Sequence, residues 1–126
     1  MCGIVGLYLK KKSLHDKLGF YLSGMLMNMS SRGPDSAGFA IYNNESKNFK
    51  FSISIPKDFK IKNFEKTIKK RFNDIKIKVI SDHIVVTTRT LPKNFISYLK
   101  NNFNEVNLIG YGKSIEVFKQ VGNPKK

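Results

Sequence analysis

The chain has 126 residues, enough for one compact domain and too few for two ordinary ones. With 40% hydrophobic and 12% aromatic residues, it is expected to form a packed core, which excludes global disorder. Its net charge of +14 raises the question of an anionic partner, while its single cysteine excludes an internal disulfide and a cysteine-rich zinc site.

No apolar run reaches the roughly 18 residues needed to cross a bilayer, so we expect no integral membrane protein. The first basic stretch, 10–12, follows the opening apolar run, whereas a secretory signal has its basic stretch first. These features predict a reduced, cytoplasmic protein.

The first third of the chain predicts a strand, a helix and a loop. Cys2–Leu9 is typical of a buried strand that begins at the terminus. Ser13 is a candidate N-cap for a helix that continues to about Met29, with apolar residues at helical spacing. The polar segment Ser30–Gly38 predicts the loop that follows.

The remaining chain alternates strands and short helices. We expect strands at 39–43, 49–55, 75–80 and 83–88, helices at 64–72 and 94–103, and a strand or hairpin at 106–121. The order β-α-β-β-α-β-β-α-β predicts an α+β fold with a mostly antiparallel sheet. Because 48–105 follows the order β-α-β-β-α by itself, we expect it to form a semi-independent lobe.

Cys2 is the residue most suited to covalent chemistry. Methionine aminopeptidase removes Met1 when a small residue follows, which would leave Cys2 with a free α-amine. An α-amine titrates near 7.7–8.0 and can act as a base beside the thiol, as in N-terminal nucleophiles. The alternative is that Cys2 is only a small apolar residue of a buried strand.

Two motifs decide between these interpretations. Met-Cys-Gly-Ile-Val-Gly at 1–6, followed by Ser-Arg-Gly-Pro-Asp-Ser-Ala-Gly at 31–38, resembles the start of class II glutamine amidotransferases, which belong to the N-terminal-nucleophile hydrolase superfamily. The segments 112–119 and 121–124 resemble the glutamate-synthase-like branch of this family.

The resemblance implies an αββα sandwich, here incomplete at its C-terminus, and a reaction that splits glutamine into glutamate and ammonia. Cys2 would attack the side-chain amide and form a γ-glutamyl thioester, with its own α-amine carrying the proton. Arg32, Gly33, Pro34 and Asp35 would form the active-site loop. The ammonia would pass to a synthase-type subunit that carries its own flavin, and we expect no metal or cofactor in this chain.

Three family elements are not found in the sequence. These are an arginine strand for the substrate carboxylate, an Asn-Gly pair for the oxyanion and a later aspartate for the substrate amine. Thr88-Arg89-Thr90 resembles the arginine strand only superficially, and Arg89 is expected to face solvent or an acidic partner. We therefore interpret 1–126 as the N-terminal part of a type-2 glutamine amidotransferase domain, which would be a fragment, a split gene product or a degenerate remnant. Little glutaminase activity is expected of it alone.

The positive charge allows other functions. Residues 47–126 carry a net +12, whereas 1–46 carry +2. Lys, Asn, Ile and Phe make up 55 of the 126 residues, a bias typical of an AT-rich coding sequence, so the lysines can be merely solvated. The alternative is a catalytically inactive binding or regulatory module that docks to an acidic partner subunit through 47–126. With 20 lysines against 3 arginines, nucleic-acid recognition is disfavoured.

Overall fold

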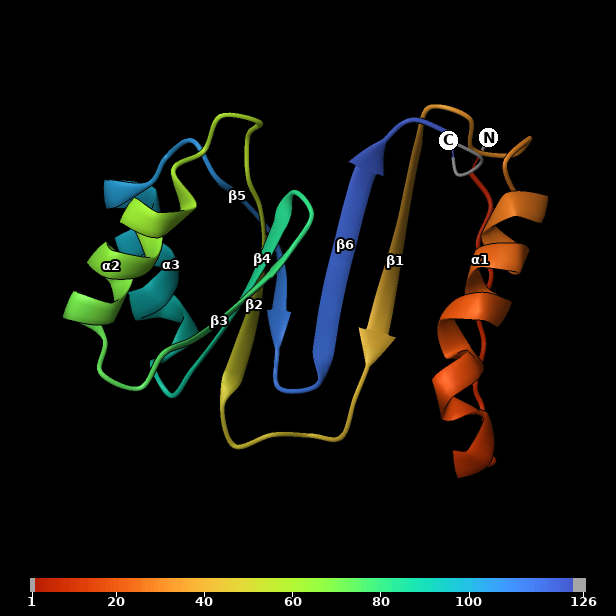
Figure 1. Cartoon of the computed structure of the whole chain (residues 1–126), viewed down its shortest axis with the longest axis horizontal. Coiled ribbons are helices and arrows are strands. Elements are labelled where there is room, and N and C mark those ends of the chain that lie inside the picture. Colours follow the sequence, from red (N-terminus) through yellow and green to blue (C-terminus); the bar gives the residue numbers. More distant parts are fainter. Residues whose placement is uncertain (1, 124–126) are drawn as a thin grey trace. The chain divides into compact units, whose positions relative to one another are not determined.

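The computed structural model describes residues 2–123, which form two compact units (Figure 1). The first unit comprises the chain up to Gly38 and the chain from Lys119 onward, and the second is Phe39–Phe118. Helices and strands are present in the order η1-α1-β1-β2-α2-β3-β4-α3-β5-β6. The predicted α+β fold class is confirmed.

In the first unit, the predicted strand Cys2–Leu9 is wrong. Residues 2–10 form neither helix nor strand, because no strand among the described residues provides them with a ladder of hydrogen bonds. Their burial still alternates as the sequence does: Val5 is half-buried, whereas Ile4 and Tyr8 are exposed. The apolar pattern was correct, but a strand also requires a partner.

The predicted helix is present but begins differently. A 3₁₀ turn, η1 (Lys12–Lys17), precedes the α-helix α1 (Leu18–Asn28). Ser13 is therefore not the N-cap, because it already lies inside the turn, which the Leu14 amide closes with a 3.0 Å hydrogen bond to the carbonyl of Lys11. No residue of α1 is buried, so its apolar side chains do not form the predicted core face.

The strands and helices of the second unit agree closely with prediction. The elements that lie wholly in it are β2 (Phe49–Ser54), α2 (Ile61–Arg71), β3 (Lys76–Ile80), β4 (His83–Thr88), α3 (Pro92–Asn102) and β5 (Asn107–Gly112). Pro92 occupies the first turn of α3, where the missing N–H of proline costs no hydrogen bond. A turn at Ser81-Asp82, with Ser81 at φ 53°, joins β3 to β4 in a hairpin.

These six elements form a split βαβ arrangement. The sheet order is β3-β4-β2-β5, and each neighbouring pair is antiparallel. Each helix thus connects two parallel strands that are separated by one antiparallel strand, which is the β-α-β-β-α-β ferredoxin-like topology.

Both helices of this unit cover one face of the sheet (Figure 1). The core between them is apolar and fully or nearly fully buried; it comprises Phe51, Ile53, Ile84 and Val86 from the sheet and Phe64, Ile68, Phe95 and Leu99 from the helices. Each such side chain contributes roughly 1.5–3 kcal/mol when it leaves water, so this core is the main source of the unit's stability.

The two remaining strands, β1 (Ser36–Tyr42) and β6 (Ile115–Val121), pair only with each other. The Asn43 amide donates to the carbonyl of Ser114 at 2.9 Å, and the Gly122 amide donates to the carbonyl of Asp35 at 2.8 Å. These bonds fit one antiparallel register in which Phe39 stands opposite Phe118, and their rings stack with centroids 5.0 Å apart.

Residues 106–121 are therefore two strands of different sheets and not a hairpin. After β5 the chain leaves the four-stranded sheet and enters the β1–β6 ribbon. Gly112 lies at this corner, where a Cβ would be 2.8 Å from Cγ2 of Ile115. The close approach requires glycine, and the corner moves the chain from one sheet to the other.

Within the second unit, the ribbon covers the face of the sheet that the helices leave free. The Val117 amide donates to the buried Ser52 hydroxyl at 2.8 Å. Lys50 forms a 3.2 Å ion pair with Glu116, and the Phe118 ring contacts the buried ring of His83. The unit therefore has three layers: helices, sheet and ribbon.

Candidate functional site

The site begins with Cys2, whose thiol is free and exposed. The next residue, Gly3, packs against the turn that follows α1. A Cβ at Gly3 would overlap Cε of Met29 and would lie 3.0 Å from Cβ of Arg32. Only glycine allows this close approach without a shift of the neighbouring side chains. The backbone directly after Cys2 is therefore packed against the turn that contains Arg32.

The turn itself is built by the end of the helix. The Met29 amide bonds to the carbonyls of Met25 and Leu26, and the Arg32 amide donates to the carbonyl of Met29 at 2.9 Å. These backbone bonds fix the chain from the last turn of α1 to Arg32. The Arg32 side chain is exposed and can therefore meet an anionic group that approaches Cys2.

The predicted loop Arg32–Asp35 is fixed at its other end by the backbone of Asp35, which accepts the hydrogen bond from Gly122. Among the described residues, Arg32 and Asp35 form no salt bridge with each other. Pro34 and Asp35 are exposed. The loop is thus held by its backbone at both ends and presents its side chains outward.

The backbone of the loop does not require a glycine at Gly33. It has no positive φ, and a Cβ there would meet only the Ser36 carbonyl oxygen, at an ordinary 3.7 Å. Gly122, in contrast, has φ +124°, a conformation that side chains rarely adopt. The backbone therefore requires the glycine of the later motif and not the glycine of the loop.

Together these contacts join three predicted segments in the first unit: the Cys2 motif, the Arg32–Asp35 loop and Gly122 of the segment 121–124. Met1, whose removal we expect, and Pro124 lie outside the described residues. Chemically, an exposed thiol can serve as a nucleophile, and an exposed guanidinium on the neighbouring turn can pair with a carboxylate.

Arg89, the arginine of the superficially similar Thr88-Arg89-Thr90 segment, lies in the other unit. It is exposed, as expected, but in a bend just after β4. Its backbone amide donates to a carboxylate oxygen of Asp74 at 2.6 Å, and the Thr88 hydroxyl donates to the other oxygen at 3.1 Å. Chiefly because of the Arg89 amide, the pKa of Asp74 is lowered from its ordinary value. The segment therefore has a structural role, since its hydrogen bonds to Asp74 stabilise the bend after β4.

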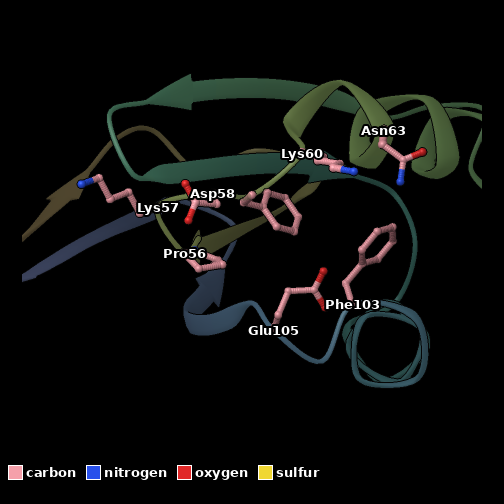
Figure 2. Close-up of a pocket in the computed structure, with 8 residues that line it drawn as sticks. Pro56, Lys57, Asp58, Lys60, Asn63, Phe103 and Glu105 are labelled. Carbon is pink, nitrogen blue, oxygen red and sulfur yellow. The ribbon is translucent and has the colours of Figure 1, made fainter.

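The second unit also contains an open pocket of about 380 Å³, shown in Figure 2. Its lining combines two phenyl rings with charged and polar groups of both signs, namely Pro56, Lys57, Asp58, Phe59, Lys60, Asn63, Phe103 and Glu105. Every charged member of this set is exposed, and no cysteine, serine or histidine lines the pocket. None of the candidate site residues Cys2 and Arg32–Asp35 lines this pocket.

Sequence reasoning missed the polar contacts between sheet and ribbon. Lys50 and Ser52 alternate with Phe49, Phe51 and Ile53 in β2, which indicates a two-faced strand. That alternation could have shown that β2 has a polar face, but not that β6 would cover it. His83 is buried, with Nδ1 2.8 Å from the Asp82 carboxylate.

Within residues 2–123, no group of three or more His, Cys, Asp or Glu side chains is arranged to hold a metal ion. In the same part of the chain, no helix has both the length and the apolar character needed to span a bilayer.

The described residues thus define an α+β protein with an exposed cysteine near its start, held against an arginine turn. Comparison with curated proteins gives this description a more particular meaning. The chain is 37% identical to the "Glutamine amidotransferase-like protein GlxB" of Rhizobium meliloti, over 99% of this chain and 42% of that protein. It is 31% identical to a "Putative glutamine amidotransferase" of Methanothermobacter thermautotrophicus, over 98% of this chain and 44% of that protein.

The chain therefore spans less than half the length of these two relatives. No protein-family model matches it, and no solved structure does. Both relatives carry glutamine amidotransferase names, in agreement with the resemblance seen in the motifs.

Proposed function

We propose that the chain is a class II glutamine amidotransferase of the N-terminal-nucleophile superfamily, with glutamine as substrate and Cys2 as catalytic residue. The observation that carries the proposal is the packing of Gly3 on Arg32, which brings the two motifs of the family resemblance together. The similarity to two proteins named as glutamine amidotransferases supports it independently.

In the proposed reaction, Sγ of Cys2 attacks the side-chain amide carbon of glutamine, and the thiol proton passes to the α-amine of the same residue. The tetrahedral intermediate collapses as this amine returns the proton to the leaving ammonia, which leaves a γ-glutamyl thioester. Water then attacks the thioester, glutamate departs and the thiol is restored. The amine acts as a base only when Met1 has been removed and the amine is neutral, so activity should rise as pH passes about 7.7–8.0.

The loop Arg32–Asp35 is proposed as the wall of the substrate site. Its backbone is anchored at Met29 and at Gly122, so the exposed Arg32 guanidinium stands on a fixed turn. On this proposal the guanidinium pairs with an anionic group of the substrate without ordering of the loop on binding.

The proposed fold is αββα. The helices, sheet and ribbon of Phe39–Phe118 form an α/β/β arrangement, which supports this proposal. Residues 48–105 are proposed as a lobe of this fold, since they contain most of the split βαβ arrangement.

Ammonia is proposed to pass to a synthase-type subunit of the glutamate-synthase-like kind. At neutral pH free ammonia is largely protonated and no longer nucleophilic, so direct transfer to an acceptor preserves its reactivity. A cytoplasmic location is part of the same proposal.

Glutamate release from glutamine by the purified chain tests the proposal, with Cys2→Ala and Cys2→Ser as matched variants and intact mass to verify removal of Met1. We expect slow release that both variants abolish. Because the family's oxyanion donors are not found in this sequence, the rate should fall about 10²–10³-fold per missing donor below that of a complete site. Release that persists in Cys2→Ala would contradict the assignment, and no release from a folded, processed chain would favour the inactive binding module instead.

A further inference from the structure

One face of α2 carries a concentrated positive charge. Its members, which we call the lysine face, are Lys62, Lys66, Lys69 and Lys70. All four are exposed, and they lie on the side of the helix opposite Phe64 and Ile68, which are buried in the core. At 1.5 Å per residue, the face extends over about 12 Å from Lys62 to Lys70.

The charge of this face is not neutralised within the described chain. None of its four lysines takes part in a salt bridge among residues 2–123. The helix contains a single acidic residue, Glu65, and the surface between Lys66 and Lys70 borders a hollow that Arg71 also lines. Four like charges on adjacent turns repel one another, so they favour an anionic surface that can pair with them.

The fold disfavours nucleic acid as the anionic partner of the lysine face. Four-stranded sheets of split βαβ modules bind single-stranded RNA by stacking bases on aromatic side chains of the open sheet face. Here that face is covered within the same unit by β6, through the bond from Val117 to Ser52 and the packing of Phe118 on His83. The lysine face has no aromatic member on which bases could stack.

The buried face of α2 also excludes insertion into a lipid surface. Phe64 and Ile68 are fully buried between the helix and the sheet, so the helix cannot turn an apolar side outward without unfolding the core. What is available is a row of exposed lysine ammonium groups, with Lys62, Lys66 and Lys70 repeating every four residues.

We propose that the lysine face of α2 is a docking surface for an acidic helix of a partner protein. Carboxylates at i, i+4 and i+8 of such a helix recur about every 6 Å, which is the spacing of Lys62, Lys66 and Lys70. The surface lies on the split βαβ module and not on the Cys2 loop, so docking does not depend on glutamine hydrolysis.

The probe for the test is a synthetic, alanine-based helical peptide of about 20 residues with glutamate at every fourth position, long enough to be helical in water. Its binding to the full chain is measured by fluorescence anisotropy at low and at physiological salt. The test variant is Lys62→Glu/Lys66→Glu/Lys70→Glu. The control variant, Lys47→Glu/Lys78→Glu/Lys93→Glu, changes the net charge equally at exposed lysines outside α2.

We expect the test variant to weaken binding about tenfold or more and the control variant by less than about twofold, with all binding weaker at higher salt. Because charge reversal could perturb the helix, the three lysines are also changed to glutamine, and the fold of this neutral variant is verified by circular dichroism. The neutral variant should also lose binding. Equal weakening by test and control variants would overturn the proposal, as would absence of peptide binding by the unmodified chain. Tighter binding of a single-stranded oligonucleotide of equal charge through the same lysines would overturn the partner class. Because no assay here measures glutamate, failure of this proposal and failure of the glutaminase proposal are distinguishable.

Discussion

The Gly122 amide donates a 2.8 Å hydrogen bond to the carbonyl oxygen of Asp35, and this bond links two segments that are 87 positions apart in sequence. It closes the open end of the β1–β6 ribbon directly beside the Arg32–Asp35 loop. Since Gly122 has φ +124°, the bond depends on a residue without a side chain.

Gly122→Ala should therefore destabilise the loop. A side chain at this φ costs of order 1–3 kcal/mol, which the ribbon end can avoid only by giving up the bond to Asp35. We expect faster tryptic cleavage after Arg32, measured by peptide mapping under native conditions. Gly24→Ala is the matched control: it lies inside α1 in open space, so it should raise helix stability by about 0.5–1 kcal/mol and leave the cleavage unchanged. Equal cleavage rates in Gly122→Ala and the unmodified chain would contradict this role of the bond.

Gly3→Ala tests whether packing on the arginine turn positions Cys2. The added methyl group would meet the flexible end of Met29 and the stiffer Cβ of Arg32, so the cysteine should shift by a few tenths of an ångström. We expect kcat/KM for glutamine to fall about tenfold, because small misplacements of a nucleophile are costly.

The double variant Gly3→Ala/Met29→Ala removes the first of the two clashes and should recover part of the lost activity. If the double variant recovers no activity, the whole loss is due to the clash with Arg32. If kcat/KM of Gly3→Ala equals that of the unmodified chain, the packing of Gly3 does not position the nucleophile.

Ser52→Ala should loosen the ribbon from the sheet. Ser52 is buried, and its hydroxyl accepts the hydrogen bond of the Val117 amide. An unsatisfied buried amide costs about 1–3 kcal/mol, so urea unfolding should show a loss of that size. Ser54→Ala, two residues along the same face of β2, should cost distinctly less, because no hydrogen bond of the Ser54 hydroxyl is seen among the described residues. If Ser54→Ala lowers the free energy of unfolding as much as Ser52→Ala does, the effect comes from changing a residue of the strand and not from loss of the hydrogen bond to Val117.

Asp74→Asn should make the stability of the second unit less dependent on pH. The Arg89 amide and the Thr88 hydroxyl bond to the ionised carboxylate and lower its pKa below the ordinary value. This stabilisation is complete above about pH 4, where the unfolded carboxyl is also ionised, and is lost as pH falls through the lower pKa of the folded state.

Urea unfolding at pH 7 should therefore show the unmodified chain to be more stable than Asp74→Asn, with the difference shrinking below pH 4. Asp58→Asn serves as the control, since Asp58 is exposed and its carboxylate has no salt bridge among residues 2–123. A difference that persists undiminished at pH 2–3 would mean that the asparagine disturbs packing rather than charge.

Most of the fold follows from hydrophobic periodicity. The helix 64–72 was predictable because Phe64 and Ile68 repeat at helical spacing, and both are buried. The strand 83–88 was predictable from its run of β-branched residues, and it is buried on both faces. The strand at Cys2–Leu9 failed because periodicity shows that a segment can pair, while pairing depends on a partner strand. The hairpin at 106–121 failed because the corner at Gly112 is a tertiary contact with Ile115.

The residues of the candidate site could be predicted from the sequence, but the contacts between them could not. Cys2 and the loop Arg32–Asp35 were identified from motifs, but the bond from Gly122 to Asp35 depends on the register of β1 and β6, to which residues far apart in sequence contribute. The hydrogen bonds from Thr88 and Arg89 to the Asp74 carboxylate were also missed. Nothing in the sequence around Asp74 indicates a hydrogen-bond partner 15 residues away.

The most direct test of the account is capture of the covalent intermediate on Cys2. The processed chain is mixed with glutamine, quenched in acid and analysed by peptide mass spectrometry, with a second sample trapped by hydroxylamine as γ-glutamyl hydroxamate. The account predicts one glutamyl group on the peptide that begins with Cys2, removed by hydroxylamine and absent from Cys2→Ala. A glutamyl adduct on any other residue, or none on a folded chain that begins with Cys2, would contradict it.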